Sequence, residues 1–458
     1  MGYSLLAGDT TVIQSKRRIC GAQHWGRKMK IRTYSRLGFY AVAAIMVLSA
    51  CGSSDSSPDD SAGSDSTVVD TTVAPDVPPK SPVTVVAIVN VTGVGAGSGP
   101  FIPDVINAWA TFINNKGGLN GHPVEVDVQD TKGDAAVSQS IIEAGLAKNP
   151  VLWLLDDPFT ESAMAASLGA TGIPVMGLGY APAVWGGYIA SMKYPCDPKP
   201  KSAFPCALPN AFPLSTTFGA VVESAAFVAK DQGATKVVFA ACAEADSCSA
   251  AAPVFSVQTK ALGLADAGLT KVSSSAADYN AECLVWIEAK VDFINMGVDG
   301  FAAGKIMANC LEQGYKGLFA ASHGSVAGAM LTGPDLVGAL NGFPWWVDDA
   351  PVVEYRDAMQ AAGVAKEGYE NPTATGMWAA MQMFAKAQAA MSDAPTAAEA
   401  LANMYTIKAE TLGGLVSSTT WTQGELAGAR ACWWNYTLKA GVLANPLGGL
   451  THQCNPAE

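Results

Sequence analysis

Apolar, β-branched runs alternate with amphipathic segments along this chain, and the alternation constrains the fold more than any other feature. Val83 to Val91 is a continuous apolar run, typical of a strand buried on both faces of a sheet. The next segment places Val105, Trp109 and Phe112 on one helical face. Further strands are expected at 124–128, 151–155, 173–178, 237–241, 291–296 and 318–321, and helices at 134–148, 160–170, 215–231, 253–265, 279–289 and 301–313. Strands that alternate with helices in this way form parallel sheets.

The length of the chain predicts that these elements form two lobes. The chain has 458 residues, whereas single hydrophobic cores stop growing near roughly 250 to 300 residues. A segment rich in Pro and Gly, residues 179–213, separates the two series of strands and helices. The predicted fold class is α/β, with two doubly wound parallel-sheet lobes. A later stripe at helical spacing is expected to be core rather than a cofactor site, and consists of Met377, Met381, Phe384, Gln388 and Met391.

The N-terminus has the pattern of a secretory signal. Lys30, Arg32 and Arg36 precede an apolar run, residues 37–48, and the sequence Leu-Ser-Ala-Cys ends at Cys51. The apolar run is shorter than the about 20 residues that a membrane span needs, and an uncleaved anchor helix is the alternative. The tetrapeptide resembles the bacterial lipobox, in which the cysteine thiol takes the lipid.

This pattern divides the N-terminal part of the chain into three segments. We expect residues 1–28 to be an over-extended N-terminus and residues 29–50 to be a signal peptide. Residues 51–81 are then a lipidated cysteine and a disordered tether, because the segment is too poor in apolar residues to form a core.

The cysteines are consistent with an exported protein. Eight remain for disulfides once Cys20 and Cys51 are set aside, and an even number in an exported chain indicates disulfides. We favour pairing between neighbours, because each pair closes a short loop: Cys196–Cys206, Cys242–Cys248, Cys283–Cys310 and Cys432–Cys454. A zinc site is the rival interpretation, but C-x2-C is absent from the sequence and the four His are scattered, so no metal is expected.

Charge and glycine spacing argue against nucleic-acid and nucleotide partners. The net charge is −12, and the arginines after residue 50 are Arg356 and Arg430 alone, whereas nucleic-acid binding needs a basic face. The glycine-rich loop 93–99 lacks the G-x-G-x-x-G spacing, because Ser98 and Pro100 stand where glycine is needed. We therefore expect no nucleic acid and no cofactor.

Catalytic motifs are weak. His323 and Ser325 lie on one loop without a G-x-S-x-G motif around the serine. The acid pairs Asp156–Asp157 and Asp348–Asp349 are explained about as well by turn chemistry as by acid–base catalysis. The sequence therefore favours a protein that is not an enzyme.

Two stretches of the sequence carry a resemblance to a known family. The run from Asn114 to Gly121 has the form Asn-x-x-Gly-Gly-x-x-Gly, and a second patterned stretch extends from Asp278 to Tyr315. The first stretch resembles the type I periplasmic binding proteins of the leucine/isoleucine/valine-binding class, and the second is similar to the pattern of that family's second lobe. The resemblance covers about residues 82–440 and implies a periplasmic-binding-protein-like I fold with a three-strand hinge. It divides the chain into lobe I, residues 82–213 plus 345–412, and lobe II, residues 214–344 plus 413–458.

The resemblance also implies a function. Such a protein is a monomer that captures a small organic solute between two lobes and delivers it to an ABC permease with its ATPase. Lipid on Cys51 would anchor it to the outer face of the cytoplasmic membrane. A ligand-sensing receptor on the same fold and an exported hydrolase are the alternatives.

Residue by residue, the resemblance places the solute against loops that follow strands of both lobes. These loops contain Ser98, Asp157, Pro158, Gly179, Tyr180, Asp246, Asp299, Phe301 and His323. Packing is the alternative role for Tyr180 and Phe301, and a satisfied loop position is the alternative for His323. Trp345 and Trp346 are expected to pack at the hinge, with stacking on the solute as second choice.

Two of these residues depart from the pattern of amino-acid binders. Asp157 would repel a carboxylate unless it were protonated, and His323 stands where an acid usually binds the ammonium. We therefore expect a neutral amide, a polyol-like or a cationic solute to bind better than leucine, isoleucine or valine.

Overall fold

The computed structural model describes residues 79–93, 100–185, 206–214, 218–244, 246–321, 326, 330–331, 333–425 and 431–456. The chain divides into two units, Met1–Ala74 and Pro75–Glu458, and the described residues belong to the second. The predicted signal peptide, lipobox and Cys51 lie outside the described residues, as do Ser98, Cys196 and His323.

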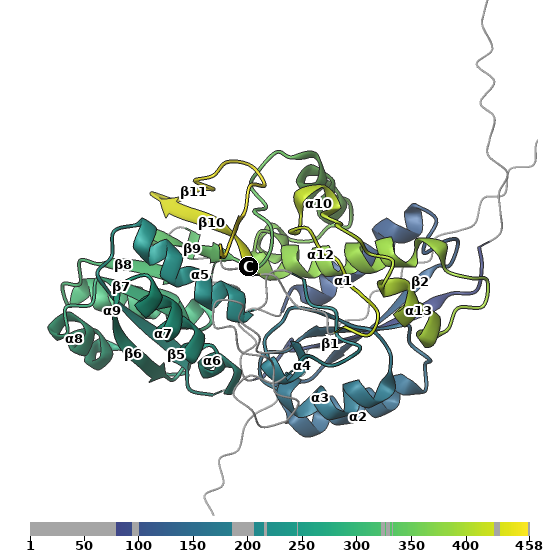
Figure 1. Ribbon diagram of the computed structural model, residues 1–458, viewed down its shortest axis with the longest axis horizontal. Coiled ribbons are helices and arrows are strands. Elements are labelled where there is room, and N and C mark those ends of the chain that lie inside the picture. Colours follow the sequence, from purple (N-terminus) through teal and green to yellow (C-terminus); the bar gives the residue numbers. More distant parts are fainter. Residues whose placement is uncertain are drawn as a thin grey trace, which may run out of the picture. The chain divides into compact units, whose positions relative to one another are not determined.

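The first sheet is parallel and has the strand order β2-β1-β3-β4. Figure 1 labels β1 and β2 of this sheet. Its strands are β1 (Val83–Val89), β2 (Val124–Asp130), β3 (Leu152–Asp156) and β4 (Val175–Gly177). The helices that connect or follow them are α1 (Ile102–Asn115), α2 (Ala135–Leu146), α3 (Glu161–Thr171) and α4 (Pro182–Trp185). The strand and helix alternation predicted for residues 83–178 is confirmed.

The central strands of this sheet, β1 and β3, are buried on both faces, as their continuous apolar runs require. Val85 and Ala87 of β1 belong to the same buried cluster as Trp109 of α1. Val86 and Ile88, the alternate residues, belong to a second cluster together with residues of α2 and α3. Because side chains alternate between the faces of a strand, helices must cover both faces of the sheet.

The second sheet has the order β11-β10-β9-β8-β7-β5-β6, and β12 pairs with β10. Its strands are β5 (Lys236–Cys242), β6 (Ala265–Val272), β7 (Phe293–Gly297), β8 (Leu318–Ala321), β9 (Leu336–Leu340), β10 (Cys432–Lys439), β11 (Val442–Ala444) and β12 (Gln453–Cys454). Strands β6, β5, β7, β8 and β9 run parallel, whereas β10 runs antiparallel to β9 and β11. The sheet is therefore mixed.

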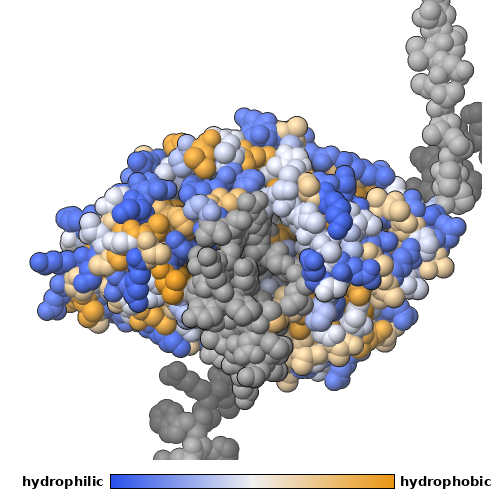
Figure 2. Space-filling model, in the orientation of Figure 1, coloured by the Kyte–Doolittle hydropathy of each residue, from blue (hydrophilic) through white to orange (hydrophobic). Residues whose placement is uncertain are grey.

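Helices of the second sheet lie between its strands in sequence. They are α5 (Phe218–Asp231), α6 (Asp246–Ala250), α7 (Ala252–Ala261), α8 (Asn280–Glu288) and α9 (Gly300–Glu312). Helix α5 packs against β9 and β10, and α7 packs against β5 and β6. Hydrophilic side chains are spread over the visible surface around these elements (Figure 2), as expected of a chain with a net charge of −12.

The chain passes three times between the two sheets. It leaves the first sheet after β4, returns after β9, and leaves again before β10. The returning segment contains α10 (Ala350–Ala361), α11 (Lys366–Tyr369), α12 (Pro372–Ala387) and α13 (Ala397–Met404). Helices α10, α11 and α12 all pack against α1 of the first sheet. This α/β architecture agrees with the predicted fold class, and the residue boundaries of the two lobes stay a prediction.

The sequence prediction was wrong for several strands of the second sheet. A helix was expected over 253–265, but α7 ends at Ala261 and β6 begins at Ala265. Strand β6 lies at the edge of the sheet, and its residues alternate between exposed and half-buried, so it has no apolar run to indicate a strand. Strands β9 to β12 were also not predicted.

Three of the four predicted disulfides are present. Cys242–Cys248 joins the end of β5 to α6, Cys283–Cys310 joins α8 to α9, and Cys432–Cys454 joins β10 to β12. Cys206 is also disulfide-bonded, and its predicted partner Cys196 lies outside the described residues. The predicted core stripe is confirmed as well, since Met377, Met381 and Phe384 of α12 are fully buried, with Gln388 and Met391 beyond it.

A buried histidine ties the beginning of the first sheet to the segment after α12. His122 has no exposed surface; its Nδ1 lies 2.6 Å from the Ser81 oxygen and its Nε2 lies 2.8 Å from the Ser392 oxygen. Beside it, the Lys80 ammonium lies 2.7 Å from the Asp393 carboxylate at the surface. The imidazole therefore bridges two main-chain segments that are far apart in sequence.

We predict that His122→Ala lowers the free energy of unfolding by about 1–3 kcal/mol, because buried hydrogen-bonding groups lose their partner. Urea unfolding measures this change. Lys80→Ala is the matched control, and it should have a much smaller effect because its partner is solvent-exposed. Equal effects of the two substitutions would contradict the bridging role of His122.

Candidate functional site

The carboxyl ends of the first-sheet strands carry a concentration of polar side chains. We call this region the first-sheet edge, and it consists of residues 90–93, 130–131, 156–161 and 178–181. The Asn90 N–H donates to the Asp156 main-chain oxygen at 3.0 Å and so joins the ends of β1 and β3. In open α/β folds, ligands bind beyond the carboxyl ends of the strands. The first-sheet edge is therefore where the fold positions one side of a binding site.

Asp130 closes the turn that follows β1. Its carboxylate accepts hydrogen bonds from the N–H groups of Val91 and Lys132, both at 3.0 Å, and from the N–H and hydroxyl of Thr92. Burial raises the pKa of this carboxyl, but the Thr92 hydroxyl and the main-chain N–H groups outweigh it and lower the pKa overall. The ionised form therefore holds the turn.

Asp157 has no exposed surface, and both its carboxylate oxygens are engaged. They accept hydrogen bonds from the Thr131 and Thr160 hydroxyls and from the N–H groups of Phe159, at 2.8 Å, and Thr160, at 3.1 Å. These bonds fix the loop between β3 and α3 to the end of β2. The Asp157 side chain therefore holds this loop, and the contact with a solute that the sequence suggested for Asp157 stays a prediction.

Asp156 pairs with Tyr180 rather than with a cation. The Tyr180 hydroxyl donates to Asp156 Oδ1 at 2.9 Å, and both residues are buried. Burial raises the pKa of Asp156 to about 7; the Tyr180 hydrogen bond opposes this rise and the charge of Asp157 adds to it. The Tyr180 side chain is therefore packed against Asp156, and its contact with a solute stays a prediction.

Glu161, the first residue of α3, was not singled out by sequence reasoning. Its Oε2 accepts three hydrogen bonds, from the Tyr180 N–H at 3.1 Å, the Ala181 N–H at 2.8 Å and the Trp185 indole N–H at 2.8 Å. Its Oε1 is buried and has no hydrogen-bond partner among the described residues. Burial raises the pKa of Glu161 well above its usual range, although the Ala181 and Trp185 hydrogen bonds oppose the rise.

The carboxyl ends of β5, β7 and β8 form the second-sheet edge, which consists of residues 242–248, 297–301 and 321. The Cys242–Cys248 disulfide closes the loop in which Asp246 begins α6. Asp299 caps α9 by accepting hydrogen bonds from the N–H groups of Phe301, at 2.9 Å, and Ala302, at 3.0 Å. The Phe301 side chain is 78% exposed, so it is available to a ligand rather than packed.

A small pocket lies where the three passages between the sheets meet. Leu178 and Gly179 of the first passage, Asn341 of the second and Leu415 of the third line it, together with Gly376 of α12. Gly179, which sequence reasoning assigned to the solute, therefore lies at this junction.

The second passage packs tightly against its neighbours. A Cβ on Gly342 would lie 2.2 Å from the Thr375 Oγ1 and 2.3 Å from the Pro372 oxygen, so only glycine allows this close approach to α12. Trp345 is buried and stacks edge-on against Trp346 with ring centroids 4.9 Å apart. Arg356 of α10 donates to the Trp345 main-chain oxygen at 2.8 Å. Hinge packing, the first choice for the tryptophan pair, describes this arrangement.

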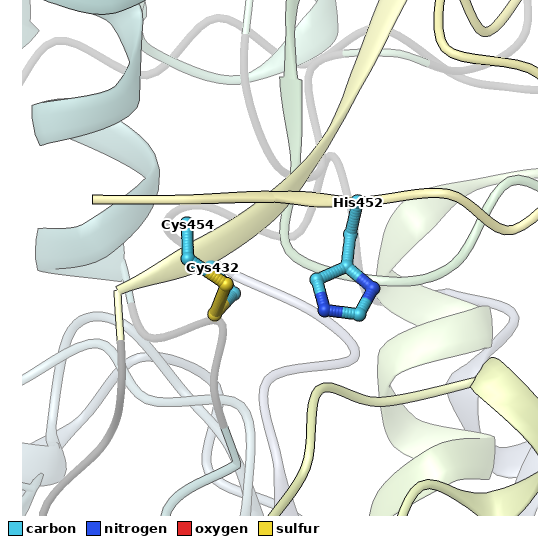
Figure 3. Close-up of side chains that lie close together, drawn as sticks. All are labelled: Cys432, His452 and Cys454. Atoms are coloured by element: carbon cyan, nitrogen blue, oxygen red, sulfur yellow. A yellow bond between two sulfur atoms is a disulfide. The ribbon is translucent and has the colours of Figure 1, made fainter. Parts of the chain in front are cut away.

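One group of potential metal ligands occurs in the described part of the chain. Cys432, His452 and Cys454 lie together at the β10–β12 pair, with their ligand atoms within 4.8 Å of one another (Figure 3). The two sulfur atoms are bonded to each other in a disulfide. Cysteine binds a metal as a thiolate, so Cys432 and Cys454 are not available as metal ligands while the disulfide is intact.

We predict that Asp156→Asn removes a pH dependence of stability. The pKa of about 7 in the folded state exceeds the ordinary value of 3.8, so the stability that protonated Asp156 contributes is lost as the pH rises through 7. At alkaline pH the variant should be more stable than wild type, by at most about 4 kcal/mol given roughly 1.4 kcal/mol per pKa unit. The difference should shrink toward pH 4, and urea unfolding at several pH values measures it.

Asp157→Asn is the matched control for this measurement. An amide nitrogen cannot accept hydrogen bonds, so the variant should be less stable by about 1–3 kcal/mol across the pH range. A pH profile of Asp156→Asn that runs parallel to that of wild type would contradict the assignment.

Known proteins similar to this chain identify its family and its fold. The family model described as periplasmic binding protein matches residues 82–441. A branched-chain amino acid ABC transporter protein from Thermus thermophilus with bound valine is 15% identical, with a TM-score of 0.68 over 83% of this chain and 98% of that chain. The comparison with curated proteins found no match.

Two further solved structures carry the same fold with other solutes in their names. A solute-binding protein from R. palustris in complex with 4-hydroxybenzoate is 16% identical, with a TM-score of 0.64 over 82% of this chain and 98% of that chain. A fatty acid ABC transporter substrate-binding protein from Thermomonospora curvata is 15% identical, with a TM-score of 0.64 over 84% of this chain and 96% of that chain. At these identities the likeness shows the fold.

The match covers most of the chain and agrees with the sheets and passages described above. It confirms the resemblance to type I binding proteins of the Leu/Ile/Val class seen in the sequence, and the family is one of binding proteins rather than enzymes. The family also implies an extracytoplasmic location. Among the described residues, no helix is long and apolar enough to cross a membrane. The chain belongs to the periplasmic binding protein family.

Proposed function

We propose that this protein is the lipid-anchored substrate-binding protein of an ABC importer, and that it delivers a small organic solute to a permease with its ATPase. The observation that carries the proposal is the family match over residues 82–441, on a fold whose two sheets are joined by three chain passages. A lobe pair joined in this way closes about a solute by hinge motion.

The solute is placed between the two sheet edges. From the first-sheet edge we propose Pro158, Gly179 and Tyr180 beside the buried Asp157, with Ser98 from the adjoining loop outside the described residues. From the second-sheet edge we propose Asp246, Asp299 and Phe301, with His323, also outside the described residues. The exposed Phe301 ring supports an apolar contact, and the buried acids of the first-sheet edge support a solute without a carboxylate at that end.

We also propose that the protein is exported and anchored to the membrane by lipid. The signal-like segment ends at Cys51, and the body of the protein begins after the segment that we interpret as a tether. Lipid on Cys51 then holds a monomer at the outer face of the cytoplasmic membrane, within reach of the permease.

We predict that a bound solute closes the two lobes. A ligand that contacts both lobes binds the closed state better, so it shifts the population toward that state and raises the melting temperature. The solute is first identified by mass spectrometry of compounds released from denatured protein, and X-ray scattering with and without it should show a smaller radius of gyration. Saturable binding with an unchanged radius of gyration would contradict hinge closure.

We predict that Cys51→Ala abolishes membrane retention when the full chain is expressed in a bacterium. Without the thiol no lipid is attached, so the tether has no acyl chains to insert into the membrane. Cell fractionation measures retention, and Cys20→Ala is the control that should retain it. Equal membrane retention of the Cys51 variant and wild type would rule out this anchor.

A further inference from the structure

Three N–H donors of the first-sheet edge converge on one oxygen of Glu161. Two of them, from Tyr180 and Ala181, are consecutive main-chain N–H groups after β4, and the third is the indole N–H of Trp185 on α4. Consecutive main-chain N–H groups that converge with a side-chain donor are the arrangement that binds a carboxylate. In this chain the carboxylate is supplied by the protein itself.

The surroundings of this carboxylate are acidic. Asp156 and Asp157 are buried nearby, and their charges raise the pKa of Glu161 further. None of the ion pairs between described residues involves these three carboxyl groups. A carboxylate from outside would therefore meet like charge and would find its donors already occupied.

The second oxygen of Glu161 is left without a donor. Oε1 is buried, and no described residue donates a hydrogen bond to it. Buried polar atoms are nearly always hydrogen-bonded, so this oxygen marks a place where a partner is missing. Burial disfavours the ionised form of Glu161, and a cationic or amide N–H group at this place would stabilise that form and give Oε1 the donor that it lacks.

We propose that Glu161 is a specificity-determining residue of the solute site, because its own carboxylate occupies the Tyr180, Ala181 and Trp185 donors. The first-sheet edge then excludes a solute carboxylate and accepts an amine or amide N–H group. This inference rests on the proposed function, since it names the chemical class of the solute that the lobes would capture.

The first test asks whether the donors bind a carboxylate once Glu161 is removed, and it needs no knowledge of the solute. Glu161→Ala vacates the three N–H groups, so sodium acetate should raise its melting temperature by about 2–5 °C over sodium chloride at equal ionic strength. Wild type should not respond. Glu399→Ala is the control, because Glu399 also accepts an N–H and a hydroxyl but at the surface, from Ser392. Acetate that fails to stabilise Glu161→Ala, or stabilises both variants equally, would overturn the proposal.

The second test uses matched solutes in calorimetry. Leucine and leucinamide differ only in replacement of the carboxylate by an amide, and isopentylamine is leucine with its carboxylate replaced by hydrogen. Wild type should bind leucinamide or isopentylamine at least about tenfold more tightly than leucine, because the first-sheet edge offers acceptors and excludes the acid. Equal or tighter binding of leucine by wild type would overturn the proposal.

Glu161→Gln separates specificity from a merely structural role, and it covers the case in which Glu161→Ala does not fold. The amide keeps an oxygen for the three donors and removes the charge, so the variant should fold, should continue to reject leucine and should bind the amines more weakly. If no compound in the panel binds, two other results are used: the acetate test, and the solute released from denatured protein. A released solute whose free carboxylate contacts Tyr180 would contradict the role of Glu161. If acetate stabilises Glu161→Ala but no solute is ever found bound, only the proposed transport function is contradicted.

Discussion

The close approach of β4 to β3 is the constraint on which the candidate site depends. Strand β3 lies between β1 and β4, with Val89 opposite Asp156 and Leu155 opposite Gly177. Gly177 has a φ of +137°, and a Cβ there would lie 2.1 Å from the Leu155 oxygen. Only glycine therefore lets the two strands pair at this point. Because β4 ends there, Tyr180 follows within reach of Asp156 and of Glu161.

This arrangement buries three acids at one edge without a basic partner among the described residues. Each acid is held by neutral donors instead: hydroxyl and main-chain N–H groups on Asp157, a phenol on Asp156, and main-chain and indole N–H groups on Glu161. Neutral donors fix the geometry of a carboxylate but do not cancel its charge, so the charge of Asp157 adds to the effect of burial in raising the pKa of Asp156 and of Glu161. The hydrogen bonds therefore hold the acids of the first-sheet edge in place. Asp156 and Glu161 favour either protonation or a hydrogen-bond donor supplied by a solute.

The sequence was sufficient to predict the parts of the fold that depend on local pattern. Strands such as β1, β3 and β7 are buried on both faces and therefore appear as continuous apolar runs, and the α12 stripe repeats at helical spacing. Strand β6 escaped prediction because it lies at a sheet edge and has no such run. Strand β10 pairs antiparallel with β9 although about 90 residues separate them, and local pattern does not encode such pairing.

The candidate site was less predictable for a related reason. Asp157 follows a buried strand, as a ligand residue would, but its role is set by the Thr131 hydroxyl, which is 26 residues away in the sequence. Glu161 resembles an ordinary first-turn acid of a helix, and its significance arises from donors 19 to 24 residues further along the chain. The sequence did contain one indication of this role. Glu161 begins α3 shortly after the end of β3, and an acid at that place can accept hydrogen bonds from the loop that follows the next strand, β4.

The two sheet edges differ in what they offer to a solute. At the first-sheet edge the Tyr180 and Ala181 N–H groups are occupied by Glu161, and Glu161 Oε1 is left without a hydrogen-bond partner among the described residues. The second-sheet edge holds its helix start with Asp299, leaves the Phe301 ring largely exposed, and restrains the adjoining loop with the Cys242–Cys248 disulfide. An apolar surface requires no directional partner, whereas an orphaned acceptor requires one donor at one place. Orientation of a solute would therefore be set by the first-sheet edge, while the second-sheet edge would contribute contact area through burial of its aromatic ring.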